Sequence, residues 1–164
     1  MQPRVEFDGF ESLDACHRLI HQNLTALGAM TRHLEAHGLD AEVQKQAAAI
    51  ETFFSSTARQ HHADEEKNVF PLLLSSGNEE LVNAARALQQ DHGWIEENWI
   101  ELAPQLRAIA DGNLWTDPAE FLHCAQVFGD LCLDHITREE TVAYPESKAY
   151  LAKAQEERKR RVGA

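Results

Sequence analysis

The most regular pattern of hydrophobic positions lies in residues 78–110, where apolar residues recur at alternating steps of four and three. This spacing is typical of a helix that turns one face toward other helices. One polar residue, His92, interrupts the predicted inner face. The full series is Leu81, Ala85, Leu88, His92, Ile95, Trp99, Leu102, Leu106 and Ile109.

Three further segments show the same periodicity, and each has polar residues on its predicted inner face. They run from Leu13 to Leu34, from Val43 to Leu72 and from Phe121 to Val142. Asp117 and Pro118 precede the last segment as a helix cap and a first helical residue. The polar residues on these three faces are His17, His61, Glu65, His135 and Glu139.

The connections between the four segments are short, so consecutive helices are expected to lie antiparallel. We therefore predict an all-α fold, an up-down-up-down antiparallel four-helix bundle with a short C-terminal fifth helix. Residues 1–164 are expected to form one domain, because a chain of this length with 43% hydrophobic residues can bury one core. The bundle is predicted for about residues 10–145, and the fifth helix for about 146–160.

The four histidines on the inner faces are predicted to lie at one level of the bundle. On either side of each loop, the two histidines lie at matching distances: 20 and 20 residues at the first loop, 14 and 14 at the second, and 18 and 17 at the third. At a rise of about 1.5 Å per residue, the mismatch is about one or two ångströms. His17, His61, His92 and His135 are therefore expected to point into the same slice of the interior.

Glu65 and Glu139 each follow one of these histidines by four residues, which places them on the same helix faces. Burying so many imidazoles and carboxylates without partners would cost several kcal/mol for each group. That cost would rival the whole stability of a domain. A cation removes this cost, and two cations remove it better, since two carboxylates can bridge a pair of ions while each ion takes imidazole nitrogens from two helices.

The two halves of the chain repeat one helical hairpin. His17 and His92 are 75 positions apart, and His61 and His135 are 74 apart. The stretches 61–71 and 135–145 also share a skeleton of a histidine, two glutamates and an aromatic-proline pair. We expect a pseudo-twofold axis through the site.

Charge and cysteine content limit the expected partners and the expected cellular compartment. A formal net charge of -12 argues against nucleic acid or an anionic membrane as the partner. Three cysteines without a CxxC motif favour packing in a reducing compartment over disulfides. Because the first residues lack the apolar stretch of a signal peptide and no apolar run could cross a bilayer, a cytoplasmic location is expected.

These motifs resemble those of the hemerythrin family, in particular the bacterial proteins with HHE cation-binding domains, over about residues 10–145. The resemblance implies a non-haem di-iron centre, that is, two iron ions bridged by an oxo or hydroxo group. It implies that His17 and His61 hold one iron, that His92 and His135 hold the other, and that Glu65 and Glu139 bridge them.

Several neighbouring residues keep more than one interpretation. Glu96, where the oxygen carriers of the family place a further histidine, is an additional candidate ligand, and His21 lies at the pseudo-symmetric position. Within residues 61–66, both His61–Glu65 and His62–Glu66 span four residues. The hydrophobic face and the distance to the following proline favour the first pair. The residues that flank the site or support its ligands are then His62, Asp64, Glu66 and Glu140.

Together with this resemblance, the histidine-rich site with two carboxylates favours a di-iron protein that binds O2 or a related small species, NO or peroxide, for sensing, storage or detoxification. Two alternatives stay open: an enzyme that consumes peroxide or donates iron for repair, and a structural bundle that holds zinc or manganese. The chain shows no nucleophile motif or cofactor loop, so whether it is an enzyme is left open. Its oligomeric state is not readable from the sequence.

Overall fold

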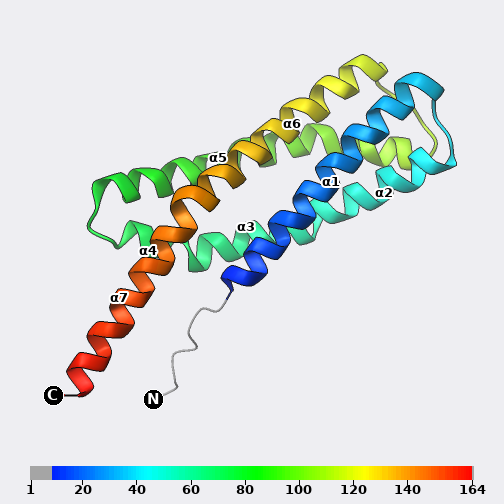
Figure 1. Ribbon diagram of the computed structural model, residues 1–164. Helices are drawn as coiled ribbons and strands as arrows, with labels where there is room; N and C mark the ends of the chain where they lie inside the picture. The colour runs from blue at the N-terminus through cyan, green and yellow to red at the C-terminus, as the bar shows by residue number, and fades with distance from the viewer. Residues whose placement is uncertain (1–8, 164) are drawn as a thin grey trace.

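The computed structural model describes residues 9–163, which form helices and connecting turns without any strand (Figure 1). The long helices are joined by tight turns, and one π-helical segment, η1, interrupts the C-terminal rod. In chain order the elements are α1 (Phe10–His37), α2 (Ala41–Ser55), α3 (Thr57–Asn68), α4 (Phe70–Leu74), α5 (Glu79–Ala110), α6 (Pro118–Arg138), η1 (Glu139–Ala143) and α7 (Tyr144–Val162).

Four rods pack as a bundle, which confirms the predicted fold class. The rods are α1, the broken series α2 to α4, α5, and α6 with η1. In Figure 1, α7 continues the line of α6 and extends beyond the bundle, so the fifth helix is a continuation of the fourth rod. Within the described residues, no helix is long and apolar enough to cross a membrane.

The second rod is broken twice, although the sequence pattern predicted one helix through this region. The first break is at Ser56, whose hydroxyl donates to the carbonyl of Thr52 at 2.6 Å. Such a side-chain bond competes with the helical ladder. The second break is at Val69, two residues before Pro71, which lacks the backbone N–H that a helix interior needs.

The fourth rod has the π-helical turn η1 just before Pro145. A π turn holds one residue more than an α turn, so every later side chain is rotated relative to an uninterrupted helix. Val142, predicted on the inner face, is therefore 39% exposed, while Ala143 and Tyr144 are buried. The expected inner position of Val142 is wrong for this reason.

Two hydrophobic clusters form the core, and they lie on opposite sides of the predicted polar level along each rod. On α1, for example, Leu13 belongs to one cluster and Ile20 to the other, with His17 between them. On α5, Leu88 and Ile95 flank His92 in the same way. The bundle therefore holds a polar layer between two apolar layers. The three cysteines, Cys16, Cys124 and Cys132, are free thiols.

Candidate metal centre

The polar layer contains six predicted site residues, and all of them are buried. The imidazoles of His17, His61, His92 and His135 are 1–7% exposed. The carboxylates of Glu65 and Glu139 are fully enclosed, at 0% exposure. Groups of this kind are seldom buried without a partner that carries charge.

The ligating atoms of His17, His61, Glu65 and Glu139 lie within 4.8 Å of one another. The Nε2 atom of His17 is 3.3 Å from Oε1 of Glu139, and the Nε2 atom of His61 is 3.2 Å from Oε1 of Glu65. We call this set the first group. It draws its side chains from α1, α3 and η1.

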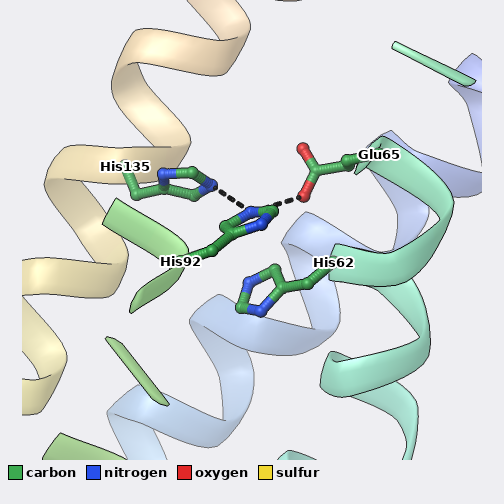
Figure 2. Close-up of side chains that lie close together, drawn as sticks. All are labelled: His62, Glu65, His92 and His135. Carbon is green, nitrogen blue, oxygen red and sulfur yellow. Dashed lines mark hydrogen bonds and ion pairs between the residues drawn. The ribbon is translucent and has the colours of Figure 1, made fainter. Parts of the chain in front are cut away.

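A second group consists of His62, Glu65, His92 and His135, whose ligating atoms also lie within 4.8 Å of one another (Figure 2). The Nε2 atoms of His92 and His135 are 3.0 Å apart. The Nε2 atom of His92 is 3.5 Å from Oε1 of Glu65. This group draws on α3, α5 and α6, so each group takes ligating atoms from three different elements.

The two carboxylates lie between the groups. Glu65 belongs to both of them. Oε1 of Glu139 is 3.3 Å from Nε2 of His17 in the first group and 3.2 Å from Nε2 of His135 in the second. Both carboxylates are thus within reach of both groups.

Several buried polar atoms of this layer have no hydrogen-bond partner, even though other polar atoms lie close by. They are both ring nitrogens of His61, Oε1 of Glu65 and both carboxylate oxygens of Glu139. A buried polar atom without a partner costs about 1–3 kcal/mol, and more if it is charged. Cations at the two groups would satisfy the oxygens of Glu65 and Glu139 and Nε2 of His61, so the residues fit metal ions.

Carboxylates orient three of the four imidazoles from outside. The Nδ1 atom of His17 is 3.1 Å from Glu140, that of His92 is 3.3 Å from Glu66, and that of His135 is 3.3 Å from Asp91. Such contacts select the tautomer in which Nδ1 carries the hydrogen and Nε2 presents a lone pair, as metal-binding histidines need.

Asp91 was not identified from the sequence, and the internal repeat gave no signal for it, because the equivalent residue in the other half is a cysteine. Asp91 precedes His92 as Cys16 precedes His17. Asp91 also accepts a hydrogen bond from Arg138 at 2.8 Å, which holds the carboxylate beside His135. In the other half of the repeat, the equivalent residue Cys16 lies beside His61. His61 therefore has a neighbouring thiol, whereas its counterpart His135 has the carboxylate of Asp91.

The electrostatics of the layer favour neutral imidazoles and ionised carboxylates. Burial lowers the pKa of His17 and of His135 below the usual 6.5, and burial together with His92 lowers the pKa of His62 well below it. Burial alone would raise the pKa of Glu65, but the imidazoles of His61 and His92 outweigh it and hold that pKa well below its usual range.

His61 differs from the other imidazoles of the layer. Burial alone would lower its pKa, but the neighbouring Cys16 and Glu65 outweigh burial and raise the pKa to about 9. In the metal-free protein this ring is therefore protonated at neutral pH. Metal binding requires a free nitrogen, so an ion at the first group displaces this proton.

Tyr144 joins the first group although the sequence interpretation did not single it out. Its hydroxyl donates to Oε2 of Glu65 at 2.9 Å and lies 3.1 Å from Nε2 of His17. Its ring stacks on that of His17, with centroids 5.1 Å apart and an interplanar angle of 9°. Burial, with the adjacent Glu65 carboxylate, raises the pKa of Tyr144, so the hydroxyl keeps its hydrogen.

The flanking candidates take different places. His62, interpreted as a flanking residue, lies inside the second group, where its ring stacks on His92 at 4.2 Å between centroids. Glu96 is 45% exposed and its carboxylate pairs with Arg59 at 2.6 Å, so it belongs to neither group. His21 is exposed and lines a groove between α1 and α6, outside both groups.

A small cavity adjoins the two groups on the side of the larger hydrophobic cluster. Its volume is about 20 Å³, enough for about one water-sized molecule. His61, His62, His135 and Glu139 form its polar wall. The remaining wall is mostly apolar and consists of Ile20, Phe54, Ala58, Ile95, Trp99, Phe128, Cys132 and Ile136, with Arg59 and Glu96 also lining it.

Comparison with known proteins likewise indicates a cation-binding domain. The sequence model of the family described as "Hemerythrin HHE cation binding domain" matches residues 8–147. An uncharacterized protein of Haemophilus influenzae is 30% identical over 99 residues, which cover 60% of this chain and 57% of that protein. The chain thus spans little more than half the length of this relative. No solved structure matches the chain.

Proposed function

Because the chain belongs to the hemerythrin HHE cation-binding family, we propose that its polar layer holds two iron ions and binds O2, NO or peroxide. In this proposal His17 and His61 hold one ion, His92 and His135 hold the other, and Glu65 and Glu139 bridge them. His62 is a further ligand of the second ion. Bound iron would supply the electrons and open coordination positions that small oxidants need.

The observation that carries the proposal is the set of buried, converging atoms without partners at His61, Glu65 and Glu139. Imidazole and carboxylate ligands together suit first-row metals such as iron. Asp91, Glu66 and Glu140 hold the imidazoles in the orientation that ligation requires. Their role is to position the ligands.

The cavity beside the two groups supports a small, uncharged ligand. Its volume of about 20 Å³ excludes bulky substrates, and apolar side chains such as Phe54, Trp99 and Phe128 dominate its wall. An apolar wall also limits water next to the ions and so favours the binding of diatomic gases over solvent. Because all three cysteines are free, we further propose a reducing compartment such as the cytoplasm.

Spectroscopy of the iron-loaded protein tests this function. Ferrous protein, prepared without oxygen, is mixed with O2, NO or peroxide, and the near-ultraviolet and visible absorption is followed. We expect about two iron ions per chain and a spectral change with at least one of these ligands. Two bound irons with unchanged spectra would refute the role in small-ligand binding. Selective retention of zinc or manganese would instead support a structural metal site.

A pair of alanine variants tests whether the cavity admits the ligand. Ala58→Val narrows the cavity, whereas Ala103→Val adds the same volume in the core at a residue that does not line it. We expect Ala58→Val to keep both irons and to slow the spectral change, while Ala103→Val reacts at the wild-type rate. Equal rates in the two variants would show that the ligand takes another route.

A further inference from the structure

The internal repeat relates the two proposed ion positions to each other. The two halves differ at one pair of equivalent aromatic residues, Phe70 and Tyr144. Phe70 follows His61 by nine positions, as Tyr144 follows His135 by nine. The ring of Phe70 lies 5.2 Å from that of His92, and the ring of Tyr144 lies 5.1 Å from that of His17. Each ion position thus has an aromatic ring packed against a histidine, His17 of α1 or His92 of α5. Only the ring of Tyr144 carries a hydroxyl.

The contacts of Tyr144 define where its hydrogen points. The hydroxyl donates to Oε2 of Glu65 at 2.9 Å. It has one hydrogen, so the hydrogen is not available to His17, whose Nε2 is 3.1 Å away. The Nδ1 atom of His17 faces the Glu140 carboxylate, which leaves Nε2 of His17 as an acceptor as well.

With the hydrogen of His17 on Nδ1, beside Glu140, a lone pair of Nε2 and a lone pair of the Tyr144 oxygen face each other across 3.1 Å. The same situation occurs in the second group, where Nε2 of His92 and Nε2 of His135 are 3.0 Å apart and both Nδ1 atoms face carboxylates. A cation that accepts both lone pairs makes each of these contacts favourable. In the first group, the Tyr144 oxygen thus faces Nε2 of His17, as Nε2 of His135 faces Nε2 of His92 in the second group.

We infer that Tyr144 is an oxygen ligand of the ion held by His17 and His61, and that it makes the two ion positions chemically unequal. This inference rests on the proposed two-ion site. The first position combines two imidazoles with carboxylate and phenol oxygens, whereas the second combines three imidazoles with carboxylate oxygen. The first position is accordingly the harder of the two and favours harder ions.

The same hydrogen bond separates the roles of the two oxygens of Glu65. Oε2 is occupied by the Tyr144 hydroxyl. Oε1 is left for the ions, at 3.2 Å from Nε2 of His61 and 3.5 Å from Nε2 of His92. Glu139 has no such restraint, since neither of its oxygens has a hydrogen-bond partner. Tyr144 therefore restricts Glu65 to binding through one oxygen.

Zinc titration of the full chain tests the inference, because zinc absorbs no visible or near-ultraviolet light. The chain has two tyrosines, Tyr144 and the partly exposed Tyr150. An ion at the phenol oxygen changes the tyrosine absorption band at about 290 nm as the first position fills. We expect this difference band in the wild type and in Tyr150→Phe, and its loss in Tyr144→Phe.

Affinity gives an independent measurement. Competition with a chelator is expected to show that Tyr144→Phe binds one of its two zinc ions about 10–100-fold more weakly. Tyr150→Phe should keep both affinities. Tyr144→Phe retains the ring that stacks on His17, and circular dichroism checks its fold. If it does not fold, the difference band of the wild type and of Tyr150→Phe still decides the question.

The outcomes separate this inference from the proposed function. A wild-type chain that binds no pair of ions overturns the two-ion site itself. A wild-type chain that binds two ions, with a Tyr144→Phe variant of equal affinities and an equal difference band, overturns only the role of Tyr144. A band that disappears in Tyr150→Phe instead would overturn it as well.

Discussion

At the scale of single residues, the charged groups around the metal centre have separate tasks. Glu65 and Glu139 lie within the polar layer, whereas Asp91, Glu66 and Glu140 lie behind the imidazoles. Carboxylates behind a ligating imidazole fix its tautomer and raise its basicity. The outer carboxylates are therefore expected to act on metal affinity through the histidines and not by direct contact with a metal.

Asp91→Asn is expected to weaken metal binding by about 10–100-fold, because His135 loses the carboxylate that orients it. Asp134→Asn is the matched control, since it removes the same charge from an exposed residue next to His135. Chelator competition measures both variants. Equal affinities in Asp91→Asn and the wild type would show that Asp91 does not support the ligand.

The metal-free protein is expected to lose stability in acid. His17, His62 and His135 have pKa values below 6.5, so the unfolded chain takes up their protons more readily and stability falls as the pH drops through about 6.5. Glu65, whose pKa is lowered from 4.5, adds a further loss below about that pH. Urea unfolding at pH 7, 6 and 5 with a chelator present measures this; an unchanged midpoint would contradict it.

His61 gives the opposite dependence. Its pKa is raised to about 9, so its contribution to stability is complete below 6.5 and is lost as the pH rises toward 9. The metal-free wild type is therefore expected to lose stability between pH 7 and pH 9, and His61→Gln is expected to lack this loss. The same urea midpoints measure both proteins, and equal alkaline profiles would contradict the shift.

At the scale of elements, two irregular turns place aromatic side chains against histidines of the polar layer. The break at Val69 precedes Phe70, and the π-helix η1 precedes Tyr144. In an unbroken α-helix, a residue nine positions after a histidine lies on the opposite side, because each residue turns about 100°. The extra residue of η1 rotates Tyr144 back toward the face of His135 and Glu139.

Removal of Val142 together with Pro145→Ala tests this account of η1. One residue fewer allows an unbroken α-helix with Tyr144 still on the ion face, so we expect the variant to bind as many ions as the wild type. Removal of Asp134, an exposed residue of regular α6, is the control. It rotates the His135 face by about 100° relative to the preceding helix and should abolish metal binding. Elemental analysis counts the ions; loss in both variants would contradict the account.

At the scale of the whole molecule, the polar layer divides the core into two clusters. The atoms without partners in this layer destabilise the metal-free bundle, since each is removed from water without a new bond. Ions that bind only to the folded chain would offset this loss of stability. The metal is therefore expected to contribute to folding as well as to ligand binding.

Each bound ion is expected to raise the stability of the folded chain by about 2.7 kcal/mol when the free ion is at one hundred times its dissociation constant. Thermal unfolding with and without metal measures the effect as a higher Tm. His61→Ala and His135→Ala each remove a ligand and should show a smaller increase. An equal Tm with and without metal would show that folding does not depend on the site.

The sequence alone determined the four-helix architecture and the level of the polar layer. Hydrophobic periodicity marks helix faces, and distances counted from shared loops place residues such as His17 and His92 at the same height. Both properties depend on spacing along the chain and need no knowledge of neighbouring rods. The internal repeat likewise related the two halves of the chain and indicated two equivalent sets of candidate ligands.

Tertiary structure decided which flanking side chains reach the centre. His62 turns inward, Glu96 pairs with Arg59 and stays out, and Tyr144 approaches Glu65. These outcomes depend on the rotation of each rod after its irregular turn and on which partner an opposite helix offers. Periodicity assumes a constant rotation per residue, so it has no information on a break at Ser56 or a π turn at Glu139–Ala143.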